Sequence, residues 1–159
     1  MMDLTRSLQS LQKQVNVQTN IEQPSAALTL TRSATLAITT AGTVITWQVE
    51  NRNQGFTWSG TTITIPTTGF YLFNFVFKIS TANQVAYAEF SVNGLQQSFM
   101  GVTPQATNTK SYTQMLYCTT GDAVTLTVYP TSNDIIAVSV EGLNRPSPIL
   151  HITQLTGAI

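Results

Sequence analysis

After residue 26 the apolar residues of this chain recur at every second position, in short runs bounded by turn-forming residues. Such runs include LTLT (28–31), TLAIT (35–39), AYAEF (86–90) and TLTVY (125–129). A two-residue period places alternate side chains on opposite faces of a β-strand. Eight to ten such runs, rich in β-branched and aromatic residues, predict an all-β antiparallel sandwich.

The run FYLFNFVFKIS (70–80), which follows a Pro-Thr-Thr-Gly turn, is expected to be the longest strand. One of its faces is assigned to the core and carries Tyr71, Phe73, Phe75, Phe77 and Ile79. The opposite face carries Phe70, Leu72, Asn74, Val76 and Lys78. A strand that is half exposed to solvent would be polar on this second side. We therefore interpret it as a surface covered by another subunit, with a further layer of the same chain as the alternative.

The first 20 residues have a different period. Their apolar residues are spaced three and four apart, at Met1, Leu4, Leu8, Leu11 and Val15. Such a narrow seam is typical of a short α-helical coiled coil, whereas a helix packed on a globular core carries a wider stripe. A single amphipathic helix lying on its own domain is the alternative. We expect residues 1–20 to form this helix, residues 21–25 to be a linker and residues 26–159 to form the head.

Charged residues are scarce, at 9% of the chain, and seven acidic side chains balance seven basic ones. Without a basic field the sequence predicts no nucleic-acid partner. No apolar run reaches the roughly 18 residues that span a bilayer, so no membrane insertion is expected. The N-terminus has no apolar core of the kind found in a secretory signal. A surface of Thr, Ser, Gln and Asn suits a protein that works fixed in an assembly.

Four segments together resemble a known family. They are ITIPTTGFYLFNFVF (63–77), VAYAEFSVNG (85–94), TTGDAVTLTVY (119–129) and ILHITQL (149–155). In this order and spacing they are similar to the tumour necrosis factor and complement globular-head superfamily, over residues 26–155. The resemblance implies a ten-strand jelly roll that forms a homotrimer through its inner sheet.

The resemblance also implies which residues form the trimer contact. It places there Leu72, Asn74 and Val76 of the central strand, Thr113, Met115 and Tyr117 of a neighbouring strand, and Ile149, His151 and Thr153 of the last strand. The sequence shows no collagen-like Gly-x-y stalk, no disulfide pair and no signal peptide, and these departures argue against a secreted cytokine or complement protein. In this respect it resembles trimeric heads of similar fold on bacteriophage and other virus particles.

No residue pattern indicates catalysis, a cofactor or a metal. His151 is the only histidine and is interpreted as a packed or interface residue, with ion binding near a threefold axis as the sharper alternative. Cys118, the only cysteine, is expected to be a small buried hydrophobe. Asp122 is expected to bond to turn backbone. Trp47, Phe56 and Trp58 are interpreted as packing residues. The alternative is that all three form a sugar-stacking platform on a loop, with Phe56 and Trp58 facing a receptor.

The sequence therefore predicts a non-enzymatic structural protein on the surface of a virus particle, made in the host cytoplasm. In this hypothesis it is a trimeric capsid decoration, cement or short-spike protein that contacts the major capsid protein or another virion protein. The first 20 residues would attach or project the head. The alternative is a receptor-binding fibre or spike tip that recognises a host-surface glycan or protein.

Overall fold

The structure is a computed structural model, which describes residues 26–102, 109–138 and 148–155. Thirteen strands in these residues form two antiparallel sheets. Sheet A has the order β2 (Leu36–Ile38), β12 (Asp134–Ala137), β7 (Gly69–Ile79), β13 (Ile149–Leu155), β1 (Ala27–Thr31) and β4 (Val49–Gln54). Strand β10 (Thr109–Cys118) also belongs to sheet A and pairs with β7 outside this order. Sheet B has the order β5 (Thr57–Ser59), β6 (Thr62–Thr64), β11 (Ala123–Pro130), β8 (Ala86–Val92) and β9 (Leu95–Val102), and β3 (Thr43–Val44) pairs with β11.

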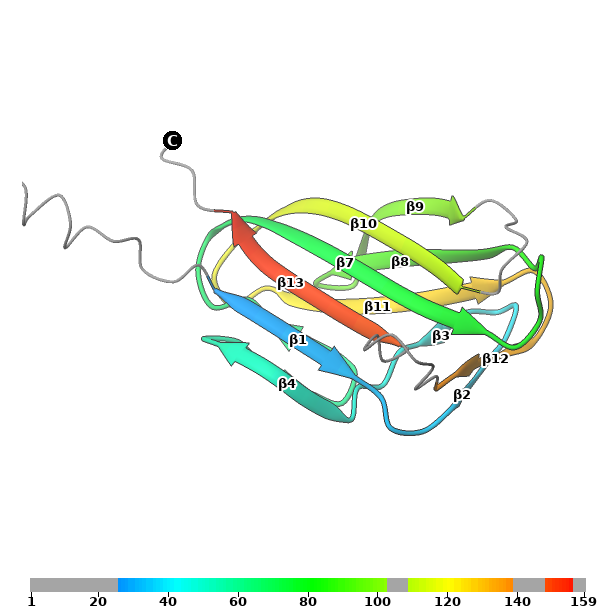
Figure 1. Cartoon of the computed structure of the whole chain (residues 1–159). Coiled ribbons are helices and arrows are strands. Elements are labelled where there is room, and N and C mark those ends of the chain that lie inside the picture. Colours follow the sequence, from blue (N-terminus) through cyan, green and yellow to red (C-terminus); the bar gives the residue numbers. More distant parts are fainter. Residues whose placement is uncertain (1–25, 103–108, 139–147, 156–159) are drawn as a thin grey trace, which may run out of the picture.

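The two sheets lie face to face, with β7, β13 and β1 in one layer and β8 and β11 in the other (Figure 1). This arrangement confirms the predicted antiparallel sandwich. Among the described residues no helix is long and apolar enough to cross a membrane. The predicted coiled-coil residues Met1, Leu4, Leu8, Leu11 and Val15 lie outside the described residues, so the coiled coil remains a prediction.

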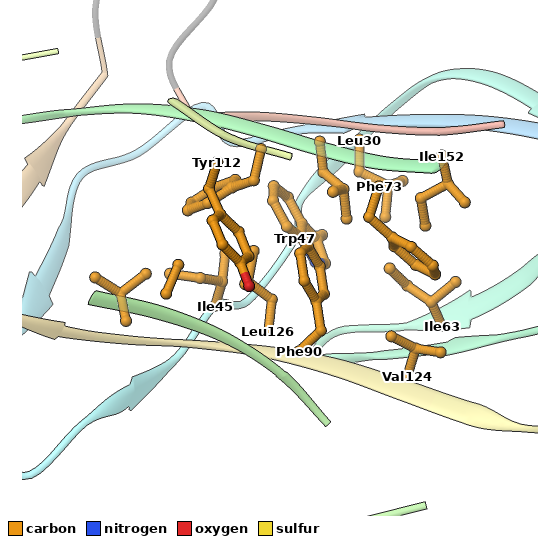
Figure 2. Close-up of a cluster of buried hydrophobic side chains, with 14 of the residues drawn as sticks. Leu30, Ile45, Trp47, Ile63, Phe73, Phe90, Tyr112, Val124, Leu126 and Ile152 are labelled. Atoms are coloured by element: carbon orange, nitrogen blue, oxygen red, sulfur yellow. The ribbon is translucent and has the colours of Figure 1, made fainter. Parts of the chain in front are cut away.

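The core lies between the sheets, and aromatic rings fill its centre. Figure 2 shows Trp47 between the layers, with Phe73, Phe90 and Tyr112 around it. The rings of Phe73 and Phe90, which come from different sheets, have centroids 4.9 Å apart. Edge-to-face and tilted ring pairs of this kind add to the free energy that apolar burial supplies. The inward residues of β7 therefore join the two layers.

The two faces of β7 differ as the sequence predicts. Its five inward side chains are fully buried: Tyr71, Phe73, Phe75, Phe77 and Ile79. Its outward side chains remain partly or largely exposed: Phe70, Leu72, Asn74, Val76 and Lys78. No described layer of this chain covers the outward side, so the alternative of a third layer from the described residues is wrong.

Two turns match the sequence prediction. Asn93 and Gly94, which join β8 to β9, have positive φ angles of 52° and 76°. Positive φ at both central positions defines the type I′ turn that Asn-Gly favours between antiparallel strands. The turn between β10 and β11 contains Gly121 at φ 89°. The β8–β9 hairpin and the turn that leads from β10 in sheet A to β11 in sheet B therefore form where glycine removes the steric cost of a left-handed backbone.

The alternation in TVITWQVE (43–50) predicts one strand, followed by a loop at NRNQG (51–55), and the structure differs from this prediction. Strand β3 ends at Val44 and β4 begins at Val49, because the chain crosses between the sheets in this interval. The Ile45 N–H donates to Leu126 O in sheet B, and the Gln48 N–H donates to Thr31 O in sheet A. The expected loop is mostly strand β4, a polar edge strand that pairs with β1. Because both sides of this edge strand are exposed, its sequence needs no alternation of apolar and polar residues. The strand therefore could not be recognised from the two-residue period.

Candidate functional site

The predicted contact residues lie on one surface, the outward side of strands β10, β7 and β13, which we call the outer face of sheet A. The strand register sets them in rows across the sheet. One row is Met115, Leu72 and Thr153, and the next is Thr113, Asn74 and His151. Val76 lies opposite Ile149 in the row beyond. The structure thus brings together all nine residues predicted for the trimer contact.

Large apolar side chains on this face remain exposed in the single chain. The exposed fractions are 58% for Met115, 54% for Tyr117 and 37% for Leu72. Phe70 lies opposite Tyr117, and the two rings meet edge to face with centroids 5.2 Å apart. A contiguous apolar patch of this kind marks an interaction surface, whereas single exposed hydrophobic residues need no explanation.

Two residues of the face were missing from the predicted contact. Phe70 had been assigned to this side of the strand but was not included among the contact residues. Leu155 pairs with Phe70 and extends the same apolar row, at 41% exposure. The alternation of His151 and Thr153 continues to Leu155, so the two-residue period was the signal that identifies it.

The centre of the face is polar. His151 Nδ1 and Thr29 Oγ1, on neighbouring strands, are joined by a hydrogen bond of 3.0 Å. Partial burial of the ring lowers the pKa of His151 from its ordinary value. Asn74 lies directly opposite His151, and its Oδ1 is buried without a hydrogen-bond partner in the described structure. This face is therefore apolar around a short, uncharged polar row.

Of the aromatic residues considered for a receptor-facing platform, two lie in the core and Trp58 remains partly exposed. The Trp47 and Phe56 side chains are buried, and Phe56 meets Tyr71 edge to face with centroids 5.9 Å apart. Phe56 as a receptor-facing residue is therefore wrong, because no ligand reaches a ring inside the core. Trp58 is half-buried and donates its indole Nε1–H to Glu50 Oε2 at 2.6 Å.

Asp122 has the turn role expected of it. The Thr119 backbone N–H donates to its Oδ2 at 2.7 Å, and Asn93 Nδ2 donates to its Oδ1 at 2.8 Å. The hydrogen bond from the Thr119 backbone, followed by that from Asn93, lowers the pKa of Asp122. Among the described residues no three His, Cys, Asp or Glu side chains lie close enough together to hold a metal ion.

Cys118 is a free, fully buried cysteine, as predicted. Burial, followed by the negative charge of Asp122, raises the pKa of its thiol to about 11. Because the thiolate is the reactive form, the native protein is expected to be inert to a disulfide reagent at pH 8. In denaturant the thiol should react orders of magnitude faster. Rapid labelling of the native protein would show that Cys118 is accessible.

No protein-family model matches the sequence, and no curated protein matches it. Solved structures match its fold. Murine APRIL has a TM-score of 0.60 at 17% identity, over 82% of this chain and 98% of that one. Eiger TNF from S. frugiperda has a TM-score of 0.55 at 14% identity, over 86% and 96%. The globular domain of zebrafish complement 1qA has a TM-score of 0.54 at 12% identity, over 82% and 98%.

These matches span almost the whole of each solved domain, at identities that show the fold alone. In the sheet topology described above, the long aromatic strand β7 and the last strand β13 lie side by side in one sheet. The chain has the jelly-roll fold of the tumour necrosis factor and complement globular heads, as the four sequence segments predicted.

Proposed function

We propose that this protein is a non-enzymatic, homotrimeric head of a virus particle, either a capsid decoration (cement) protein or a short spike. The observation that carries the proposal is the apolar outer face of sheet A. Its five large exposed side chains are 37–58% exposed in the single chain: Phe70, Leu72, Met115, Tyr117 and Leu155. Burial of such a patch between copies supplies free energy in proportion to the apolar area removed from water.

Three copies, rather than two, are supported by the resemblance of residues 26–155 to heads that trimerise through this sheet. The proposal places Leu72, Asn74 and Val76 of each copy at the contact. Their cross-strand neighbours on β10 and β13 join them. The partner of this face is therefore the protein itself, and other surfaces remain for other partners.

A non-enzymatic role is supported by the chemistry of the face. The His151 ring is hydrogen-bonded to the Thr29 hydroxyl and lies opposite Asn74, and no described carboxylate orients the ring as the third group of a catalytic triad. The described carboxylates cap turns or bond to neighbouring side chains, as Asp122 and Glu50 do. The proposal therefore requires neither a cofactor nor a metal.

The amino-acid composition supports the proposed location on a virus particle. A chain in which 9% of the residues are charged has little long-range repulsion, which suits a protein held in a fixed array. We propose that the head sits on the virion surface and that residues 1–20 attach it to the major capsid protein or another virion protein. In this proposal the outer face of sheet A is buried in the head's own trimer, which leaves the N-terminal segment for attachment.

The test is co-sedimentation of the purified protein with particles stripped of it. The full chain is expected to pellet with the particles, and a chain lacking residues 1–20 is expected to remain in the supernatant as a folded head. Antibody labelling in electron micrographs should place the full chain on the particle surface. Co-sedimentation of the truncated head would assign attachment to the head instead.

A receptor-binding spike tip is the second candidate, and Trp58 is the observation that favours it. Its indole is half-buried at the sheet edge and is held by Glu50, which leaves a fixed aromatic surface beside the polar strand β4. Stacking on such a ring is a common mode of sugar recognition. Binding of the full chain to host cells but never to particles, with loss of binding in Trp58→Ala, would favour this candidate over decoration.

A further inference from the structure

The polar row across the outer face of sheet A has histidine at its centre. In register, Thr113 lies opposite Asn74, Asn74 opposite His151, and His151 opposite Thr29. On one side of this row lie Leu72 and Met115. On the other side the row of Val76 and Ile149 follows. The imidazole thus lies inside the apolar face rather than at its edge.

The hydrogen bond between His151 and Thr29 suits both protonation states of the ring. A threonine hydroxyl donates to a neutral Nδ1 and accepts from a protonated one. The bond therefore neither favours nor opposes protonation. What decides the charge of His151 is its surroundings: water in the single chain, and apolar side chains when the face is covered.

Within the described part of the chain, the groups that face His151 offer no negative charge. Strands β7 and β1, which flank β13, present Asn74 and Thr29 beside the ring. The charged residues of this side of the sheet are Lys78 on β7 and Arg52 on β4, both cations. The described carboxylates lie elsewhere: Glu50 bonds to Trp58, Asp134 to Ser80, Asp122 to the β10–β11 turn, and Glu89 lies in sheet B.

We propose that acid releases the self-association of this face, because protonation of His151 places an unpaired charge in a surface that other copies bury. This inference rests on the proposed function. A charged group moved out of water without a counter-ion is strongly disfavoured. The cost recurs in every copy, so a trimer that stays assembled must keep its histidines neutral.

The sign of the effect follows from linkage. Partial burial in the single head already lowers the pKa of His151, and full burial in the assembly lowers it further. Separated heads therefore bind more protons than assembled ones as the pH falls through the pKa of the separated head, which lies below the ordinary value of about 6.5. Association is complete above that pKa and weakens as the pH falls through it.

Because the chain has a single histidine, an effect of pH on self-association can be assigned to one side chain. His151 is the only histidine among the 159 residues. Histidine is the side chain whose ordinary pKa lies between pH 5 and 8. A change in association between pH 7.5 and 5.0 that disappears when His151 is replaced therefore belongs to this ring.

The experiment is sedimentation equilibrium of the full-length protein at pH 7.5, 6.5 and 5.0, with the wild type, His151→Gln and His151→Lys compared. In the wild type the concentration at half-dissociation is expected to rise at least 10-fold between pH 7.5 and 5.0. The dissociation constant of the trimer can rise by at most about 30-fold for each histidine that must stay neutral at pH 5. The glutamine variant should show no such rise, and the lysine variant should be dissociated at every pH.

Circular dichroism at each pH establishes that the chains remain folded. A wild type that stays equally assembled from pH 7.5 to 5.0 would overturn the acid release and leave the proposed trimer intact. An equal rise in the glutamine variant would overturn it as well, because a group other than His151 would be responsible. A wild type that is a single chain already at pH 7.5 would instead overturn the proposed self-association itself.

Discussion

Replacing Leu72 by aspartate is expected to convert the assembled protein into single folded chains. Leu72 lies at the middle of the outer face of sheet A, between Met115 and Thr153. Its side chain is 37% exposed, so the aspartate reaches solvent in a separated head. In the assembly the same carboxylate would be buried without a partner, at a cost of several kcal/mol in each copy.

Light scattering after size exclusion measures the result directly. The wild type should have three times the 17.3 kDa mass of one chain, and Leu72→Asp should have the mass of one chain. Leu95→Asp is the matched control, because Leu95 is 70% exposed on β9 in the other sheet. It should remain trimeric. A Leu72→Asp variant that keeps the wild-type mass, or an equal loss in Leu95→Asp, would show that this face is not the contact.

Replacing Phe73 by alanine is expected to lower the free energy of unfolding by about 3–5 kcal/mol. Phe73 is fully buried on the inward face of β7 and packs against Phe90 of the opposite sheet, with ring centroids 4.9 Å apart. Loss of the ring removes its apolar burial and leaves a cavity between two layers that cannot close fully. Denaturant unfolding, followed by tryptophan fluorescence, measures the change.

Phe70→Ala is the control, since Phe70 belongs to the same strand but points outward and is 40% exposed. Both variants are best compared in the Leu72→Asp chain, where dissociation does not contribute to unfolding. There Phe70→Ala should cost about 1 kcal/mol or less, because an exposed ring loses little burial. If the two substitutions cost the same, the assignment of the two faces of β7 would be wrong.

Local patterns in the sequence determined much of the fold. The two-residue period placed the side chains of β7 on their correct faces, because this period is a property of the extended backbone itself. The Asn93-Gly94 and Gly121 turns were readable for a similar reason, since glycine is favoured where φ is positive. The order of four segments was enough to indicate the jelly roll, and with it the strands that carry the outer face.

Only the tertiary structure decided which residues meet across the sandwich. Trp47 and Phe56 are buried because their segments cross or adjoin the gap between the sheets, which no local period reveals. Lys110 is buried on the inward face of β10, with no hydrogen-bond partner for its Nζ in the described structure, although its charge predicts exposure. The row of Thr113, Asn74, His151 and Thr29 comes from four strands that are distant in sequence. Local sequence sets the direction of each side chain, but strand register and layer packing are long-range properties and set its neighbours.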